Sequence, residues 1–109
     1  MPYDPHLARR LKAILKSRND IVDLNMFGGV GFLLRGNMCV GVYKDYLILR
    51  LGAEQAAEAL TQKHVKPFDI TGRPMKGWVM VHKDGVASKP SLNKWINLAI
   101  VFVNQLPRK

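Results

Sequence analysis

Apolar residues recur at helical spacing near the start of the chain, and they predict an amphipathic helix over residues 5–17. Asp4 suits the N-cap, and Pro5 suits the first helical position, where a missing N–H has no intrahelical partner to lose. The apolar side of this helix carries Leu7, Leu11, Ile14 and Leu15. The outer side carries Arg9, Lys12 and Lys16, with Arg10 beside them.

Three strands are expected next, over residues 26–35, 38–43 and 46–51. The first has a glycine-rich start. Gly36-Asn37 and Lys44-Asp45 are short turn signals between these apolar runs, as hairpins require. The three strands therefore form an antiparallel meander.

The second half of the chain begins with Gly52 and a predicted helix over residues 53–62, which is rich in good helix formers. A short strand over 65–70 contains Pro67, which favours a sheet edge. A strand over 77–82 places Trp78, Met80 and His82 on one face and Val79 and Val81 on the other. Asp84-Gly85 then signals a turn.

A last helix is predicted from an N-cap at Ser91 to Leu106, with Pro107 closing it. Its buried stripe consists of Leu92, Trp95, Ile96, Ala99, Ile100, Val103 and Leu106. Leu98 and Phe102 widen this stripe beyond the ~100° that packing on one core needs. Two explanations stay open: a deep cradle in the sheet, or a dimer interface that includes Leu98 and Phe102.

The predicted order is α-β-β-β-α-β-β-α, which indicates an α+β fold with helices packed on an antiparallel sheet. A length of 109 residues with 48% apolar residues fits one globular domain spanning residues 1–109.

The longest apolar run is far shorter than a membrane span, so no membrane association is expected. Cys39 is the only cysteine, which excludes an intrachain disulfide and favours a cytoplasmic location.

The net charge of +9 makes nucleic acid the first partner to weigh, against simple solubility. The densest group of candidate phosphate contacts is Arg9, Arg10, Lys12, Lys16 and Arg18. A looser second group is Lys63, Lys66, Arg73 and Lys76. Phosphate contact needs no sequence motif, so the pattern does not distinguish either group from an ordinary solvated surface.

Candidate chemistry is sparse. The glycines at 28, 29 and 31 lack the lysine and following helix of a phosphate-binding loop, so they are interpreted as permitting a bulge or close backbone approach. Cys39 is expected to be a buried, inert thiol. Asp20/Asp23 and Glu54/Glu58 do not form an acid–base pair, and the three histidines are far apart in sequence. We therefore expect no catalytic residues, no metal, no cofactor and no enzyme activity.

Several motifs in fixed order resemble the TfoX N-terminal domain family. The first is Met26-Phe27-Gly28-Gly29-Val30-Gly31-Phe32, followed by Gly36-Asn37-Met38. The later ones are Leu47-Ile48-Leu49-Arg50, Pro67-Phe68 and Leu92-Asn93-Lys94-Trp95, so the resemblance covers roughly residues 10–105. The motif residues Met26, Phe27, Gly28, Gly29, Gly31, Gly36 and Met38 are interpreted as structural.

This resemblance implies the same α-β-β-β-α-β-β-α order and a link to regulation of natural competence. Two-domain relatives carry a further C-terminal domain, and the resemblance covers only the N-terminal one. The chain departs from the family pattern at Leu24-Asn25, Cys39-Val40 and the strand around Trp78. Two functions follow as hypotheses: a regulatory or adaptor domain acting through a protein partner or self-association, and a nucleic-acid-binding module using the basic first helix.

Overall fold

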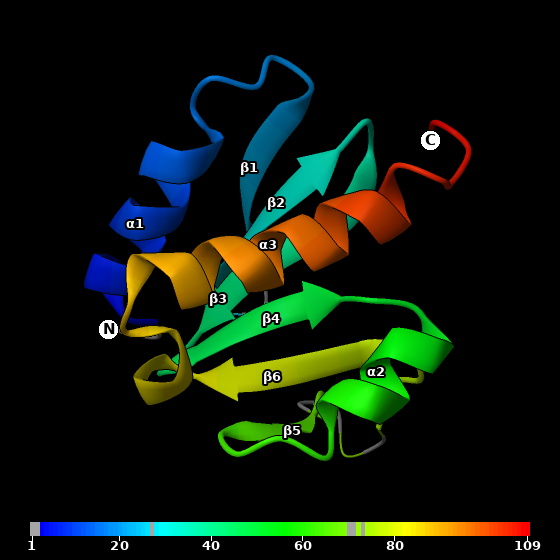
Figure 1. Cartoon of the computed structure of the whole chain (residues 1–109). Coiled ribbons are helices and arrows are strands. Elements are labelled where there is room, and N and C mark those ends of the chain that lie inside the picture. The colour runs from blue at the N-terminus through cyan, green and yellow to red at the C-terminus, as the bar shows by residue number, and fades with distance from the viewer. Residues whose placement is uncertain (1–2, 27, 70–71, 73) are drawn as a thin grey trace.

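The computed structural model of the chain describes residues 3–26, 28–69, 72 and 74–109. Its helices are α1 (Pro5–Leu15), α2 (Ala53–Ala59) and α3 (Lys89–Val103), with a short 3-10 helix at Lys83–Val86 (Figure 1). Its strands are β1 (Ile21–Met26), β2 (Gly29–Leu34), β3 (Asn37–Tyr43), β4 (Tyr46–Arg50), β5 (Val65–Pro67) and β6 (Trp78–His82). The α+β class is confirmed, and the predicted succession of elements is found.

One further strand, β1, precedes the predicted meander. The sequence analysis expected no strand here, and the apolar residues Val22 and Leu24 are 66% and 51% exposed, so they do not face the core. Strand β1 pairs with β2 along its whole length, from Ile21 opposite Leu34 to Met26 opposite Gly29. It therefore adds an edge strand to the sheet.

The strands form one sheet in the order β1-β2-β3-β4-β6-β5. All of its pairings are antiparallel. Pro67 lies in the edge strand β5, as its missing backbone N–H favours. Ile70, which the sequence placed at the end of this strand, lies outside the described residues.

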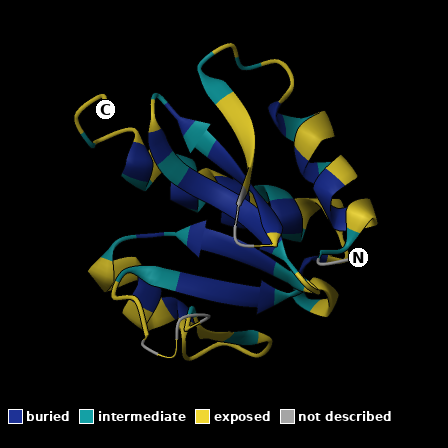
Figure 2. Ribbon diagram, turned by 180° about the vertical axis from the view of Figure 1, so that it is seen from behind, coloured by how far each residue is buried: buried dark blue, intermediate teal, exposed yellow. Residues whose placement is uncertain are grey.

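Alternation along the strands gives the sheet two different faces. Leu47 and Leu49 of β4 belong to the main hydrophobic cluster, as do Val79 and Val81 of β6. Helix α3 packs on β3 and β4 over this face, and α1 contacts β3 (Figure 1). The intervening residues of the same strands point to the opposite side, which we call the open sheet face (Figure 2).

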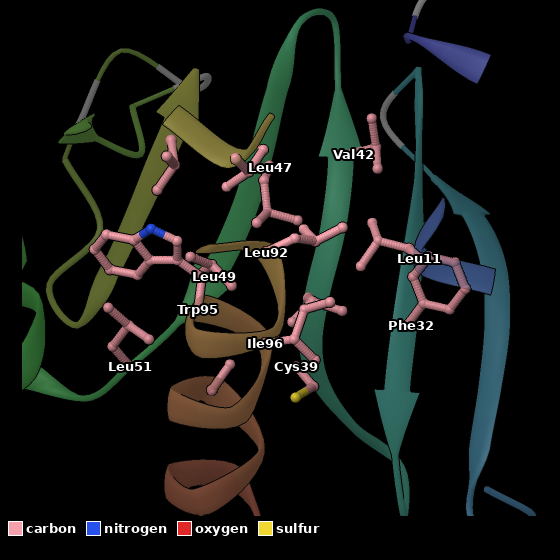
Figure 3. Close-up of a cluster of buried hydrophobic side chains, with 14 of the residues drawn as sticks. Leu11, Phe32, Cys39, Val42, Leu47, Leu49, Leu51, Leu92, Trp95 and Ile96 are labelled. Atoms are coloured by element: carbon pink, nitrogen blue, oxygen red, sulfur yellow. The ribbon is translucent and has the colours of Figure 1, made fainter. Parts of the chain in front are cut away.

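The core lies between the sheet and its helices. Figure 3 shows Leu47, Leu49 and Leu51 beside Leu92, Trp95 and Ile96 of α3. Leu92 is 1% exposed and Trp95 is 4% exposed, so both residues pack in the core. Leu98 and Phe102 are partly buried against the same cluster, which matches the cradle explanation of the wide stripe on α3.

Several predicted boundaries are wrong by a few residues. Helix α3 is capped by Ser88 rather than Ser91: the Ser88 hydroxyl accepts from the Ser91 N–H at 3.2 Å, and Lys89-Pro90 open the helix. Pro90 fits the first turn, where its missing N–H has no partner to lose. Helix α3 ends at Val103 and α2 at Ala59, each about one turn early. The segment predicted as a turn at Asp84-Gly85 winds into the 3-10 helix.

Candidate functional site

The five basic residues predicted to contact nucleic acid lie on or just after α1, and several already have partners. Arg18 donates two hydrogen bonds of 3.1 Å to the Asp20 carboxylate. Lys12 Nζ lies 3.7 Å from Asp23 Oδ2, and Arg10 Nη2 donates to the Ala87 carbonyl at 3.3 Å. Arg9 and Lys16 are exposed.

These contacts reduce the positive potential that α1 presents. The hydrogen bonds from Arg18 lower the pKa of the Asp20 carboxyl, and the same hydrogen bonds raise the pKa of Arg18. Both groups therefore stay charged and matched to each other near neutral pH. A role for α1 in binding nucleic acid stays a prediction.

The two residues predicted for a dimer interface on α3 are partly buried against the core of their own domain. The ring of Phe102 lies against Gly52, where an added Cβ would come within 2.6 Å of Phe102 Cε1. Leu98 is also partly buried against the core. The apolar residue that α3 does expose is Val101, at 60%. Self-association through α3 stays a prediction, and a substitution at Val101 can test it.

The glycine motif shapes the turns around β2. Gly28 adopts a φ of 77° in the turn from β1 to β2. Gly29 lies so close to the Val42 carbonyl oxygen that a side chain there would clash. Gly36 takes a φ of 88° in the β2–β3 turn, against the main chain of Lys109. These positions need glycine for backbone reasons.

Two further motif residues, Gly31 and Met38, lie on the open sheet face. Gly31 pairs with Gly41 across β2 and β3. The Met38 side chain reaches over Gly41, where an added Cβ would lie 3.0 Å from its terminal methyl carbon. Phe27 lies outside the described residues, and so does the side chain of Met26.

Cys39 is fully buried on β3, as predicted. Burial raises the pKa of its thiol to about 12, so the thiolate is scarce at neutral pH.

No cluster of three metal-ligating side chains occurs in the described part of the chain. None of the helices described has the length and apolar character that a membrane span needs.

The open sheet face carries a cluster of aromatic and basic side chains that the sequence analysis did not predict. Each of three cations lies over an aromatic ring: Lys66 over Tyr46 at 4.6 Å, Lys44 over Tyr43 at 5.4 Å, and Arg50 over Trp78 at 5.4 Å. All three rings are half-buried, and Lys44 and Lys66 are exposed. We call Tyr43, Lys44, Tyr46, Arg50, Lys66 and Trp78 the aromatic-basic patch.

Pairing of the strands brings this patch together. Tyr43 lies opposite Tyr46 across the β3–β4 turn, and Arg50 lies opposite Trp78 across β4 and β6. Lys66 of β5 lies opposite Met80 on β6. Residues directly opposite in an antiparallel pair share a face of the sheet. Cations and rings from four strands therefore gather on one surface.

The alternation Tyr46-Ile48-Arg50 against Leu47-Leu49 was the available sequence signal for this patch. A similar alternation along β6 predicted the face that holds Trp78, Met80 and His82, and this prediction is confirmed, since Val79 and Val81 belong to the core cluster. The rest was missed because Tyr43, Tyr46 and Trp78 come from strands whose pairing order is not visible along the chain.

A second feature of the open sheet face is its edge at β1. Val22 and Leu24 alternate there with Asp23 and Asn25. The pairing of Val22 with Leu33 and of Leu24 with Gly31 places both apolar side chains on the open sheet face. We call Val22 and Leu24 the apolar edge.

Fold and surface together define a small α+β domain whose sheet is covered by helices on one side and presents side chains on the other. The model of the family described as the TfoX N-terminal domain matches residues 13–103. The chain therefore belongs to that family, and the resemblance seen in its motifs is confirmed. Neither the comparison with curated proteins nor the comparison with solved structures found a match.

Proposed function

We propose that this TfoX-family domain is a non-catalytic regulatory adaptor that acts through protein contacts, in the control of competence or transcription. Membership of the family supports a regulatory role. The observation that carries the proposal is the exposed edge strand β1, because an edge strand with outward apolar side chains is a ready site for strand addition.

The hydrogen-bond pattern identifies the free side of β1. The Arg35 N–H donates to the Asp20 carbonyl at 3.0 Å, which makes this a hydrogen-bonded pair. Such pairs alternate along an antiparallel ladder, so Val22 and Leu24 also bond to β2. The backbone groups of Ile21, Asp23 and Asn25 consequently point away from the sheet, where another strand can pair with them.

The occupant we propose is β1 of a second copy. Two such strands are self-complementary, because antiparallel pairing brings the apolar edges of both copies to the same side. The charge of +9 on each copy opposes this association, and salt screens that repulsion over ~8 Å at physiological ionic strength. Self-association should therefore strengthen as salt is added.

Sedimentation over a range of protein concentrations, at low and high salt, tests this proposal. Val22→Lys and Leu24→Lys should each shift the protein to monomer by adding charge at the interface. Val101→Lys is the matched control, since Val101 is 60% exposed and Val22 is 66% exposed. A strict monomer at every concentration would contradict self-association. Dissociation by Val101→Lys alone would assign the contact to α3.

A further inference from the structure

The aromatic-basic patch has a chemistry that the β1 contact does not use. Three half-buried rings lie beside three cations on one surface. Aromatic rings stack on nucleobases, and lysine and arginine neutralise phosphates. We propose that this patch binds single-stranded nucleic acid, with bases stacked on Tyr46 and Trp78 and phosphates held by Lys44, Arg50 and Lys66.

The rings are held in place before any ligand arrives. Ile48 and Met80 are 3% and 5% exposed, yet neither belongs to the main core cluster. Ile48 lies opposite Met80 on the open sheet face, between the pair Tyr46–His82 and the pair Arg50–Trp78, so these neighbours share one surface. At one end, Tyr46 meets His82 edge-on at 5.3 Å; at the other, Phe68 packs against Trp78 at 5.5 Å. Ordered rings lose little freedom on stacking, which favours binding.

The spacing of the rings suits a single strand. Tyr46 and Arg50 are four residues apart on β4, which separates them by roughly 13 Å, and Trp78 lies opposite Arg50. The two rings are thus separate stacking positions along one path. A single strand can offer bases to both. A duplex keeps the faces of its bases stacked within the helix, so it can meet the cations but not the rings.

The charges on the patch are available for phosphate. No salt bridge to Lys44, Arg50 or Lys66 occurs among the described residues. The nearby carboxylates have other contacts: Asp45 lies 3.6 Å from Lys83, and Asp84 lies 3.4 Å from His82. Lysine side chains are long and flexible, so Lys44 and Lys66 can leave the ring faces to a base and move to the phosphates.

Neither stacking nor phosphate neutralisation uses the sugar hydroxyl. The patch should therefore bind DNA and RNA single strands alike. This inference does not depend on self-association, since β1 lies at one edge of the sheet and the patch spans β3 to β5. Failure of one proposal leaves the other standing.

The test is fluorescence anisotropy with labelled oligothymidine of about 12 nucleotides, within the ~4–16-nucleotide range of such sites. Tyr46→Leu and Trp78→Leu keep an apolar cover over Ile48 and Met80 but remove the rings. Each should weaken binding roughly 5- to 100-fold. Tyr46→Phe is the matched control and should bind as the wild type does, because it keeps the ring.

Salt dependence gives a second readout that folding defects would not mimic. Three phosphate contacts predict a slope of log affinity against log salt of about −2, since each contributes ~0.7 on a single strand. Lys44→Glu and Lys66→Glu, both at exposed positions, should each reduce this slope. Trp78 fluorescence should also be quenched on binding, while the buried Trp95 should not respond.

Clear outcomes would overturn the proposal. Duplex DNA of the same length should bind at least about 10-fold more weakly, and equal or tighter duplex binding would contradict stacking. Oligouridine should match oligothymidine, and a preference above about 10-fold would show that the sugar is read. Unchanged affinity in both leucine variants would remove the rings from the site.

Discussion

The two faces of the sheet come from the same strands and differ in what their side chains can do. On β4, Leu47 and Leu49 are fully buried under α3, while Tyr46 and Arg50 are half-buried on the open sheet face. The helix-covered face holds the fold together by apolar burial. The open sheet face keeps aromatic and basic groups within reach of solvent. Alternation thus places the residues that stabilise the fold on one face of the sheet and the residues that we propose for binding on the other.

The largest difference between the faces should appear in stability. Leu49→Ala removes a fully buried side chain and should lower the free energy of unfolding by about 2–5 kcal/mol. Leu24→Ala makes the same chemical change at a side chain 51% exposed and should cost about 0.5 kcal/mol or less. Urea unfolding of both variants measures this. Equal costs would mean that the apolar edge belongs to the core.

An alkaline titration probes the covered face through Cys39. The buried thiol has a pKa of about 12, against 9.0 for a free thiol, so the unfolded chain ionises first. The stability that the neutral thiol contributes is complete below pH 9.0 and is lost as pH rises toward about 12. This loss should amount to about 1.4 kcal/mol per pH unit.

Cys39→Ala should remove this part of the alkaline decline, and all other titrating groups stay the same in the two proteins. The measurement is the stability difference between wild type and variant by urea unfolding, from neutral pH upward. The difference should shrink above pH 9.0. A constant difference would show that solvent reaches the thiol in the folded protein.

The smallest expected effect concerns the basic surface of α1. Arg9→Glu with Lys12→Glu should change oligothymidine affinity by about threefold or less, through long-range charge alone. Lys44→Glu with Lys66→Glu reverses the same amount of charge within the aromatic-basic patch and should weaken binding far more. Anisotropy at two salt concentrations compares them. A larger loss of affinity in the α1 variant would place the nucleic-acid-binding site on the first helix instead of the aromatic-basic patch.

Local patterns predicted much of the architecture because they reflect local physics. Helical spacing with Asp4 and Pro5 predicted α1, and the Asp4 carboxylate does accept from the His6 N–H at 2.9 Å. Turn signals predicted the meander of β2, β3 and β4. The N-cap of α3 was misplaced because Ser88 and Ser91 are both good caps, and Ser91 instead donates its hydroxyl hydrogen to the Gly85 carbonyl at 2.7 Å.

The surface residues were harder to predict from sequence. The basic cluster of α1 looked free along the chain, but Asp20, Asp23 and the Ala87 carbonyl meet its cations in the fold. Leu98 and Phe102 are excess apolar residues in the sequence pattern, but in the fold the Phe102 ring packs against Gly52. In both cases a turn or another element contacts the side chain, so the sequence alone overestimated how many basic and apolar groups stay available at the surface.

The sequence by itself determined the helices, most of the strands, the family and the burial of Cys39, since each depends on residue spacing or an ordered motif. Only the tertiary structure decided that β1 forms an exposed edge and that β6 inserts between β4 and β5. That insertion brings Trp78 opposite Arg50 and Lys66 near Tyr46. Strand order arises from contacts between distant segments, which no local pattern encodes, and it is strand order that assembles the aromatic-basic patch.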